Sequence, residues 1–371
     1  MARRFQVRSH IVAAALWQSL LTVGRRRSPD LVRRVLVTHH PQMLGDTLLL
    51  TPLLAKLRQR YSAAEIVLTA SPTTAALYGK HPYGVQAMPY DPRNHKTLRT
   101  LFGAQGFDLA IVPGDSRYSW LARALGARWV VGFAGDRPAS KNWMMDQLTP
   151  YPNQPGMWGD MAAALVDGAP PAPYRPEDWP APDYRTFDMP QQPYCVLHVG
   201  ASTQLKLWGP EKWRALASYL TECGLRVVWS GGHNEQRVVE EIDATGQHRS
   251  LVGQLDLPQL WHLLANAALL VCPDTGVAHL GRIVDTPTVT LFGPGSPVLC
   301  GVGEFWKNSP YRAVTVEDFP CRDQRVFFRR SIVWVRRCGR GTNDCVSVGA
   351  CMNAIQIEDV QKAIAALGVS A

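Results

Sequence analysis

Short apolar segments alternate with helical stretches in two series along the chain. The first series predicts strands at 35–38, 65–69, 109–112 and 129–132, and helices at 46–61, 73–80 and 118–125. The second series predicts strands at 194–198, 226–230, 268–272 and 288–292, and helices at 210–222, 235–243, 258–266, 276–284 and 357–367. Strands that alternate with helices form parallel sheets covered on both faces. The sequence therefore predicts two α/β domains in tandem.

A proline-rich region separates the two series. Eleven of the 28 prolines fall within residues 150–193, where a short helix is predicted at 157–167. Proline cannot donate to a sheet ladder, so we interpret this region as a connection between domains. The predicted parts are an N-terminal extension, a first α/β domain, a linker, a second α/β domain and a C-terminal helix. Their ranges are 1–32, 33–170, 171–193, 194–350 and 351–371, respectively.

The composition is that of a folded, basic protein. Of 371 residues, 46% are hydrophobic, and 39 Lys and Arg against 30 Asp and Glu give a net charge of +9. No apolar run reaches the roughly 18 residues that a membrane-spanning helix needs. The positive balance favours anionic partners such as phosphorylated glycans, nucleotides, nucleic acids or lipid surfaces. Eight cysteines in so long a chain are weak evidence for disulfides, so we expect reduced thiols and a cytoplasmic protein.

The N-terminal extension combines arginines with an apolar stretch. Eight arginines lie in residues 1–34, and the apolar stretch runs between two groups of them. Val12, Leu16, Leu20 and Val23 recur at helical spacing, which predicts an amphipathic helix with basic ends. Such a helix suits an anionic membrane surface. A helix packed on the protein's own core, or a loose extension, is the alternative. A triple arginine follows the apolar stretch in place of a cleavage site of small residues, which opposes export.

Asp46 is the candidate catalytic residue of the first domain. It follows the first predicted strand and Gly45, at the start of the first predicted helix. A carboxylate in this place can accept a proton from a substrate hydroxyl. The other interpretation is a helix N-cap, because Asp is common at that position.

The loop after the first strand of the second domain carries groups that suit a phosphate. Gly200, Ser202, Thr203 and Lys206 precede a predicted helix. Backbone N–H groups, hydroxyl donors and a lysine charge together can bind phosphate oxygens. The spacing differs from the P-loop pattern, so an NTPase of that kind is not expected. A polar surface loop is the alternative.

Two further strand ends supply candidate ligand-binding residues. Glu235 follows two glycines, where its carboxylate could accept from a ribose hydroxyl or cap a helix. The segment Asp274-Thr275-Gly276-Val277-Ala278-His279 lies between a strand and a helix. Asp274 is the predicted N-cap there, and the N–H groups after it suit a nucleotide diphosphate. His279 would lie about one turn further on, either near the same site or as a buried structural histidine.

Several functional classes are disfavoured. No G-x-G-x-x-G follows a predicted strand, which argues against a nicotinamide-dependent dehydrogenase. The G-x-S-x-G and H-E-x-x-H motifs are absent. The basic–aromatic motifs of known nucleic-acid-binding modules are absent too, so no nucleic-acid partner is expected.

Together these segments resemble glycosyltransferase family 9, the ADP-heptose:lipopolysaccharide heptosyltransferases. The resemblance rests on Gly45-Asp46 with Thr51-Pro52, on Lys206-x-Trp208, and on Asp274-Thr275-Gly276-x-x-His279 with Leu291-Phe292-Gly293-Pro294. The segment from Asp108 to Phe133 is also similar to that family. The likeness covers about residues 33–365, and the Asp-Thr-Gly-x-x-His element is its most specific part.

The resemblance implies a GT-B fold, in which two Rossmann-like domains face across a cleft. It implies that the N-terminal domain takes the acceptor and the C-terminal domain takes the nucleotide sugar. It also implies inversion of the anomeric centre, with no metal or other cofactor in the chemistry. By this resemblance Asp46 is the general base, Lys206 contacts the donor phosphates, and Glu235 falls near the acid that holds the ribose. The donor-binding turn then comprises Asp274, Thr275, Gly276 and His279.

One departure from the family concerns the loop before Lys206. The best-known members have two adjacent threonines there, whereas this chain has Ala201-Ser202. Ser202 keeps a hydroxyl group and Ala201 does not, which puts the detailed donor contacts and the donor's identity in question. We count Ser202 and Thr203 among the donor-binding residues.

A segment near the C-terminus collects cysteines and arginines. Cys321, Cys338, Cys345 and Cys351 could supply four thiolates to zinc or iron, although no C-x-x-C pair is present. Locally packed, reduced thiols are the alternative. The arginines either bind phosphate or carboxylate groups of an acidic acceptor or form a solvated basic face. They are Arg322, Arg325, Arg329, Arg330, Arg336, Arg337 and Arg340.

The resemblance, with which these observations agree, implies an inverting glycosyltransferase that moves a heptose from ADP-heptose to the inner core of lipopolysaccharide. Asp46 would be the base, and Lys206 with the turn 274–279 would stabilise the leaving ADP. The expected location is the cytoplasmic side, peripheral at the inner face of the bacterial inner membrane. The alternatives are a family member with another nucleotide-sugar donor or a protein acceptor, and a catalytically silent relative that binds nucleotide or glycan.

Overall fold

The chain divides into two compact α/β units, and the computed structural model describes residues 2–22 and 26–369. The first unit comprises Met1–Ala172, Glu177–Pro180 and Val326–Trp334. The second comprises Pro173–Pro176, Ala181–Arg325 and Val335–Ala371. The two α/β units predicted from the sequence are confirmed. The return of residues 326–334 to the first unit was not predicted.

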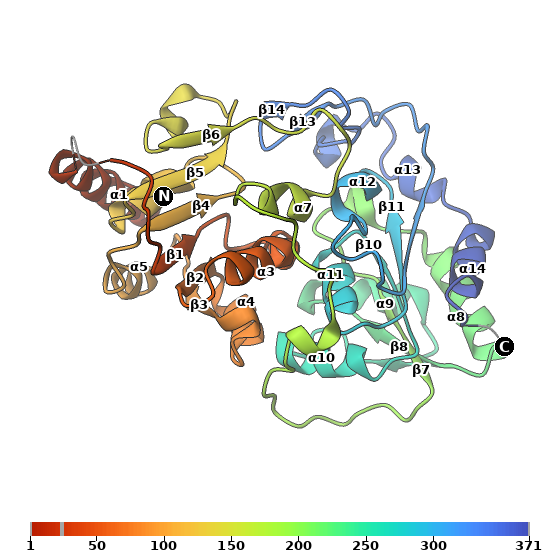
Figure 1. Ribbon diagram of the computed structural model, residues 1–371. Helices are drawn as coiled ribbons and strands as arrows, with labels where there is room; N and C mark the ends of the chain where they lie inside the picture. The colour runs from red at the N-terminus through yellow and green to blue at the C-terminus, as the bar shows by residue number, and fades with distance from the viewer. Residues whose placement is uncertain (1, 23–25, 370–371) are drawn as a thin grey trace. The chain divides into compact units, whose positions relative to one another are not determined.

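The first unit is built on a six-stranded sheet in the order β3-β2-β1-β4-β5-β6, with every neighbouring pair parallel (Figure 1). The strands are β1 (Arg34–Val37), β2 (Glu65–Ala70), β3 (Val85–Pro89), β4 (Leu109–Val112), β5 (Trp129–Phe133) and β6 (Gln147–Thr149). Val35, Leu36 and Val37 are fully buried, as expected for a parallel strand covered on both faces. Parallel pairing also brings the carboxyl ends of β1, β3 and β4 to one edge of the sheet.

Seven helices in the described residues belong to the first unit. They are α1 (Ala2–Leu21), α2 (Leu44–Leu48), α3 (Thr51–Arg60), α4 (Pro72–Ala75), α5 (His95–Phe102), α6 (Tyr118–Ala124) and α7 (Trp158–Ala163). The single helix predicted at 46–61 is wrong, because the chain forms α2 and α3 there. Pro52 lies in the first turn of α3. Proline lacks the backbone donor of a helix interior and clashes with the preceding turn, so a helix begins at it instead of running through it.

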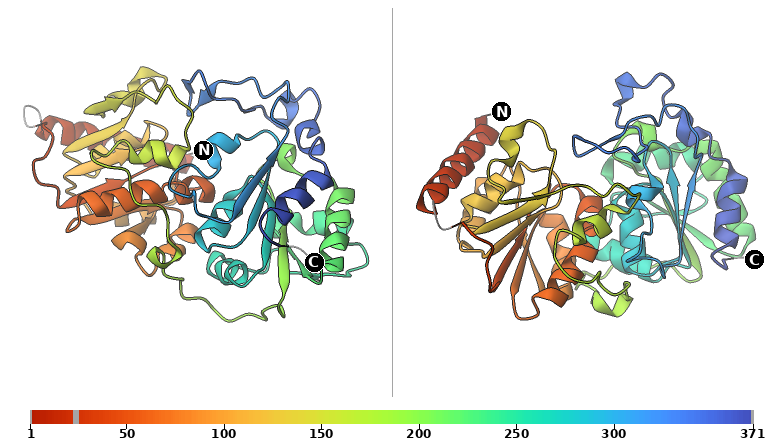
Figure 2. Two further views of the ribbon diagram at one scale, coloured as in Figure 1. Left: turned by 45° about the vertical axis from the view of Figure 1, so that its right-hand side comes forward. Right: turned by 45° about the horizontal axis from the view of Figure 1, so that its top comes forward.

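Helix α1 confirms the helix predicted in the N-terminal extension, and one of its faces packs on the unit's own core. Val7, Ile11 and Ala15 are buried and belong to the same apolar cluster as Leu121 of α6. In both views of Figure 2, α1 lies along one side of the unit that contains β1 to β6. The spacing of these three residues places them on one face of a helix. Packing on the core, the alternative considered above, is therefore found for this face.

A second apolar face of α1 points away from the core. We call it the α1 stripe, and it consists of Val12, Leu16, Trp17, Leu20 and Leu21, which are 40% to 69% exposed. The fourth residue of the predicted face, Val23, lies outside the described residues. No helix in the described part of the chain is both long and apolar enough to cross a membrane.

The second unit repeats the arrangement with a parallel sheet in the order β12-β11-β10-β7-β8-β9. Its strands are β7 (Tyr194–His198), β8 (Arg226–Ser230), β9 (Arg249–Ser250), β10 (Leu269–Pro273), β11 (Thr288–Phe292) and β12 (Tyr311–Thr315). Its helices are α8 (Pro210–Glu222), α9 (Gln236–Ile242), α10 (Leu257–Ala265), α11 (Gly276–Ile283), α12 (Pro297–Cys300), α13 (Ala350–Asn353) and α14 (Ile357–Ala365). Leu197, Trp213 and Leu291 lie in its core. Strands 194–198, 226–230 and 288–292 and helix 210–222 are confirmed to the residue.

A short antiparallel ribbon from late in the chain completes the first unit. Its strands are β13 (Val326–Phe327) and β14 (Arg330–Ser331). Phe328 and Arg329 turn the chain with positive φ angles of 44° and 61°. The rings of Phe327 and Phe328 lie 6.0 and 5.0 Å from the ring of Trp158 on α7. Aromatic packing thus holds the ribbon on the first unit.

Candidate functional site

The predicted donor-binding residues of the second unit follow three neighbouring strands at their carboxyl ends. In the sheet, β10, β7 and β8 lie side by side and parallel. The loops after them carry Asp274 to Gly276, Ser202 to Lys206, and Glu235, respectively. Ligands of open α/β sheets bind at this edge. The topology therefore brings to one edge residues that are far apart in sequence, such as Lys206 and Asp274, which are 68 positions apart.

Lys206 and Asp274 form an ion pair at this edge. The Lys206 Nζ lies 2.8 Å from Asp274 Oδ2 and 2.6 Å from the Asp274 backbone oxygen. The two side chains are only 20% and 10% exposed. Lys206 ends a short 3-10 turn, Gln204–Lys206, whose N-cap is Thr203. The structure thus joins two residues that the sequence predicted as donor ligands.

Glu235 lies against glycines of the loops that follow β7 and β8. A Cβ added at Gly200 would lie 3.3 Å from the Glu235 carboxyl carbon, and one added at Gly232 would lie 2.8 Å from Glu235 Oε2. A side chain at either position would therefore force the Glu235 carboxylate to shift. Glu235 occupies the N-cap position of α9, but its side chain makes no capping hydrogen bond. The carboxylate is thus not used as a helix cap.

Helix α11 begins at this edge, and its N-cap is Thr275. The predicted N-cap, Asp274, is wrong by one residue. Thr275 has the extended backbone of a cap (φ −137°), whereas the Asp274 carboxylate is paired with Lys206. The Thr275 hydroxyl is buried and has no hydrogen-bond partner among the described residues. It adds a donor beside the first N–H groups of α11.

Two histidines at this edge are buried and neutral. His279 is 5% exposed, and its Nδ1 contacts the guanidinium of Arg282. Burial, together with the charges of Arg282 and Lys206, holds the His279 pKa well below its usual value. Burial lowers the pKa of His198 to about 4, and its Nδ1 lies 3.1 Å from Ser230 Oγ. His279 has the surroundings of a structural histidine, and its contact with a donor stays a prediction.

The two hydroxyl residues of the loop differ in their surroundings. Thr203 is half-buried, and its Oγ1 accepts a bond from the Leu205 N–H at 3.4 Å. Ser202 is exposed. Thr203 therefore fixes the turn that presents Lys206, whereas Ser202 presents its hydroxyl to solvent.

In the first unit, Asp46 lies in the first turn of α2, just after β1. The N-cap of α2 is Met43, so the interpretation of Asp46 as an N-cap is wrong. Asp46 is half-buried, and its charge contributes to the raised pKa of Tyr118. The buried His39 has its pKa lowered to about 3 by burial and the nearby His40, and its Nε2 lies 3.4 Å from Thr47 Oγ1. A carboxylate thus stands at the carboxyl edge of the first sheet, as the catalytic assignment requires.

A second charged cluster of the first unit was not singled out as a site from the sequence. Burial alone would raise the pKa of Asp115, but hydrogen bonds from Arg117 and Lys141 outweigh it and lower this pKa to about 2. Lys141 Nζ lies 2.9 Å from Asp115 Oδ1 and 3.0 Å from Asp136 Oδ1. Asp136 also accepts a bond from the Ser116 N–H at 2.8 Å. A signal was present, because Asp115 to Arg117 lie in the segment that resembles family 9.

Arg330 connects the late ribbon to this cluster and is buried. Its guanidinium donates to the backbone oxygens of Gly114, Phe133 and Ala134 at 2.8 to 3.0 Å. It also donates to Ser116 Oγ at 2.8 Å and lies 3.6 Å from the Asp136 carboxylate. Its hydrogen-bonding capacity is therefore used inside the protein.

The other arginines of the late segment do not form one anion-binding face either. Arg322 is buried and donates to Thr315 Oγ1 and to the Glu317 backbone oxygen. Arg340 forms an ion pair with Asp323 at 2.8 Å, and Arg336 lies 3.7 Å from an Asp318 carboxylate oxygen. Arg325 and Arg329 are exposed. The prediction of a single basic face is thus wrong for Arg322 and Arg330, which are buried and donate to backbone oxygens.

The four late cysteines are free thiols, and two of them, Cys338 and Cys351, are buried. Burial and the neighbouring Cys321 and Cys338 raise the pKa of Cys351. Within residues 2–22 and 26–369, no three or more His, Cys, Asp and Glu side chains are grouped so that they could hold a metal ion.

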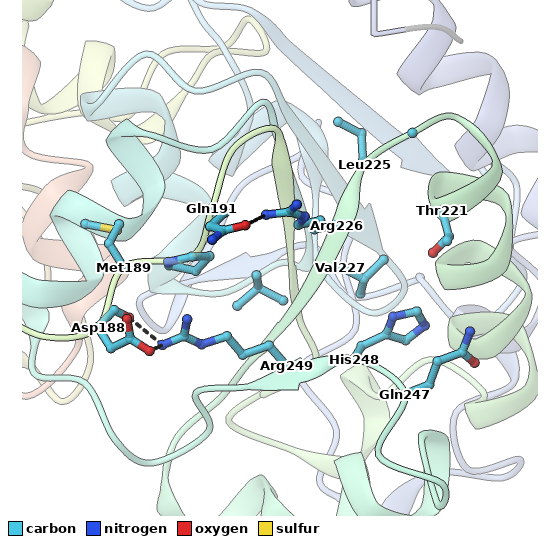
Figure 3. A pocket seen from close by; sticks show the side chains of 13 residues that line it. Asp188, Met189, Gln191, Thr221, Leu225, Arg226, Val227, Gln247, His248 and Arg249 are labelled. Atoms are coloured by element: carbon cyan, nitrogen blue, oxygen red, sulfur yellow. Dashed lines mark hydrogen bonds and ion pairs between the residues drawn. The ribbon is translucent and has the colours of Figure 1, made fainter.

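A pocket of about 610 Å³ occupies the opposite edge of the second sheet, at the amino ends of β8 and β9 (Figure 3). Its charged groups are already paired. Arg249 lies 2.9 Å from an Asp188 carboxylate oxygen, and Arg226 donates to the Gln191 side chain at 2.5 Å. It therefore lies apart from the predicted donor residues, which follow the carboxyl ends of the strands.

Comparison with known proteins gives a family match and a shared fold. The family model described as glycosyltransferase family 9 (heptosyltransferase) matches residues 95–324. Lipopolysaccharide heptosyltransferase 1 of Pseudomonas aeruginosa is 28% identical over 228 residues, which cover 58% of this chain but only 61% of that protein. Lipopolysaccharide heptosyltransferase 3 of Escherichia coli is 26% identical over 309 residues, 76% of this chain and 89% of that protein. The structure of E. coli ADP-heptose lps heptosyltransferase II has a TM-score of 0.65 at 19% identity, covering 90% of this chain and 98% of that chain. The last likeness shows that the chain has the GT-B fold.

Proposed function

Because the chain belongs to glycosyltransferase family 9, we propose that it transfers a heptose from ADP-heptose to the inner core of lipopolysaccharide. The observation that carries this proposal is the Lys206–Asp274 ion pair beside Glu235 and the start of α11. The relatives named above support it, since lipopolysaccharide heptosyltransferases align with 58% and 76% of the chain. The shared fold with an ADP-heptose enzyme supports the choice of donor.

In this proposal Asp46 acts on the acceptor. Its carboxylate takes the proton of an acceptor hydroxyl, and the hydroxyl oxygen forms a bond to the anomeric carbon of the donor sugar. The bond between that carbon and the diphosphate oxygen breaks on the opposite side, so the configuration is inverted. ADP leaves with the electron pair of the broken bond.

The second unit holds the leaving group. Before the donor binds, Asp274 holds the Lys206 ammonium at the site. When the donor binds, Lys206 turns from Asp274 to the diphosphate oxygens. The Thr275 hydroxyl and the first N–H groups of α11 can donate hydrogen bonds to the negatively charged diphosphate as well. Glu235 accepts from the ribose hydroxyls. Nothing in this sequence of steps needs a metal or a resident cofactor.

The Ala201-Ser202 pair favours a second candidate, a family 9 enzyme with another donor. Ser202 is exposed and Ala201 has no hydroxyl, so one donor contact of the best-known members has no counterpart here. The same chemistry would then act on another nucleotide sugar, or on a protein acceptor. A silent relative that binds nucleotide or glycan without turnover is the third candidate.

We also propose that the protein works at the cytoplasmic face of the inner membrane, attached through the α1 stripe. Leu16, Trp17 and Leu20 are 48%, 62% and 69% exposed on a helix rich in arginine. Apolar side chains with basic neighbours bind at an anionic lipid surface without crossing it.

The first experiment is to measure ADP release from ADP-heptose with a panel of truncated lipopolysaccharide acceptors. We expect release that depends on one acceptor, and the product would show which sugar is extended. Nucleotide release from another nucleotide sugar, but not from ADP-heptose, would show that the enzyme uses that other donor. No release with any donor, while ADP still binds, would favour the silent relative.

A further inference from the structure

A pocket of about 510 Å³ opens in the first unit beside α1. One wall is the α1 face that carries Val7, Arg8, Ile11 and Val12. The remaining walls are loops that follow the carboxyl ends of β1, β3 and β4, together with the start of α6. The pocket therefore lies at the edge of the sheet where ligands of such folds bind. The family match begins at residue 95, so α1 lies outside it.

Arginines from three segments line this pocket. They are Arg8 of α1, Arg93 after β3 and Arg117 after β4. Arg8 and Arg93 are exposed, and neither guanidinium has a hydrogen-bond or ion-pair partner within the described residues. Arg117 is paired with Asp115 at 2.7 Å. The one acidic lining residue, Asp91, accepts from the Arg93 backbone N–H at 2.9 Å. Two cationic groups are thus left for a ligand.

Aromatic side chains form the floor of the pocket. Tyr90 and Tyr118 are 3% and 7% exposed, and Trp120 is half-buried. Burial raises the pKa of Tyr118 to about 12, so its hydroxyl is a neutral donor at pH 7. Arg8 lines the same pocket as both tyrosines, and its charge acts on the pKa of each. Apolar surface and a few polar groups together are typical of a small-molecule site.

We propose that this pocket binds an anionic sugar of the acceptor, with Arg8 and Arg93 on its phosphate or carboxylate group. The inference rests on the proposed function, which it deepens by naming the acceptor's chemistry and the helix that selects it. Arginine forks match the geometry of both anions. The ring faces of the sugar lie against Ile11, Val12 and Trp120. Tyr118 lines the pocket, and the charge of the proposed base Asp46 contributes to the raised pKa of this tyrosine.

The test is calorimetric titration of the whole protein with glucose 1-phosphate, glucuronate and glucose. We expect both anionic sugars to bind at least about tenfold more tightly than glucose, since a bond to a charged group adds about 1.5 kcal/mol or more. Changing Arg8→Gln and Arg93→Gln together should remove that preference. Arg99→Gln is the matched control, because Arg99 is an exposed arginine of the same unit outside the pocket. Arg8, Arg93 and Arg99 are all exposed, so the variants should fold.

Several outcomes separate the pocket from the rest of the protein. Lys206→Ala should leave the sugar affinities unchanged, which shows that the probes do not bind at the donor residues. Equal affinity for glucose and the anionic sugars, or an unchanged preference in the double variant, would overturn the inference. If the double variant Arg8→Gln and Arg93→Gln loses binding to phosphatidylglycerol vesicles but keeps its affinity for the anionic sugars, the sugar-binding inference is overturned. The two arginines would then bind a lipid headgroup.

The proposed function and the pocket can fail separately. If no lipopolysaccharide acceptor is glycosylated but the double variant still loses its preference for anionic sugars, the proposed function is wrong and the pocket inference remains supported. If glycosylation is found and the double variant keeps the wild-type KM for the acceptor, the pocket inference fails alone. The expected result is a KM raised at least about tenfold with a smaller change in kcat.

Discussion

The ammonium of Lys206 lies between the carboxylate and the backbone oxygen of Asp274, at 2.8 and 2.6 Å. The two residues come from loops after different strands, β7 and β10, and are bonded where both loops meet. A lysine held by a neighbouring carboxylate loses little side-chain freedom when an anion arrives. In the proposed function, the pair therefore positions a positive charge before the donor binds.

Replacing Lys206 by alanine should weaken ADP binding at least about tenfold, because one charge-assisted hydrogen bond is lost. The variant also leaves the Asp274 carboxylate without its partner, which adds repulsion toward the diphosphate. Calorimetry with ADP measures the change. Lys362→Ala is the control, since Lys362 is an exposed lysine of the same unit on α14. Equal affinities for wild type and K206A would remove Lys206 from the donor site.

The variant Asp46→Asn should lower turnover about a hundredfold or more and leave ADP affinity unchanged, since an amide cannot take the proton. ADP release and ADP binding are measured on the same sample. Asp167→Asn tests for general effects of losing a carboxylate, because Asp167 is exposed and lies in the same unit. Wild-type turnover in D46N would show that another group is the base.

The α1 stripe should govern attachment to anionic vesicles. The double change Leu16→Ser and Leu20→Ser removes apolar surface from two side chains that are 48% and 69% exposed, so folding should be little affected. In a sedimentation assay with phosphatidylglycerol vesicles, the bound fraction should fall. Leu31→Ser, at a leucine 62% exposed outside α1, should sediment like the wild type. Equal sedimentation of all three proteins would count against attachment through α1.

Arg330→Met should destabilise the protein by about 3 kcal/mol or more, because it removes one of the two cations near a buried carboxylate and the donor of several buried backbone oxygens. The affected groups are the Asp136 carboxylate, Ser116 Oγ and the oxygens that Arg330 binds. Urea unfolding measures the difference. Arg325→Met changes an exposed arginine nearby and should cost less than about 0.5 kcal/mol. Similar unfolding midpoints for the two variants would contradict the structural role of Arg330.

His198 should make stability depend on pH between about 6.5 and 4. Burial lowers its pKa to about 4 in the folded state, whereas the unfolded value is about 6.5. Protonation therefore favours the unfolded chain, so this contribution is complete above pH 6.5 and is lost as the pH falls toward 4. The loss amounts to about 3 kcal/mol.

The measurement compares unfolding free energies at pH 7 and pH 4.5 in wild type, His198→Gln and His10→Gln. H198Q should lose less stability on acidification than the wild type. His10 is exposed on α1, so H10Q should follow the wild-type curve. A parallel curve for H198Q would mean that His198 is not held neutral.

The strands predicted from the sequence are the interior strands of both sheets, and the missed ones are all edges. Interior strands β1, β7 and β11 are buried at nearly every position and read as continuous apolar runs. The edge strand β3 (Val-Gln-Ala-Met-Pro) is buried only at its first residue, and β6 has no buried residue. A strand that faces solvent on one side needs no apolar run, so its sequence does not distinguish it from a loop.

The clustering of the proposed donor residues was predictable because a parallel sheet gathers the carboxyl ends of its strands at one edge. That rule predicts Lys206, Glu235 and Asp274 at one edge. Lys206 and Asp274 form an ion pair there, and Glu235 lies near Gly200, which follows the neighbouring strand β7. It does not fix single helix starts, since Asp and Thr both cap helices well, and Thr275 takes the place expected for Asp274. The partners of Arg330 were beyond sequence reasoning, because most are backbone oxygens about 200 positions away.

Because residues 326–334 belong to the first unit, that unit cannot complete its folding until this late segment has been synthesised. A ribosome that has released the first 172 residues has not yet made Arg330, so the oxygens of Gly114, Phe133 and Ala134 lack the donor that binds them in the native protein. The N-terminal unit is therefore completed only after most of the second unit has been synthesised. A fragment cut at the proline-rich connection would hold an unfinished first unit, and a peptide carrying 326–334 is the piece that would complete it.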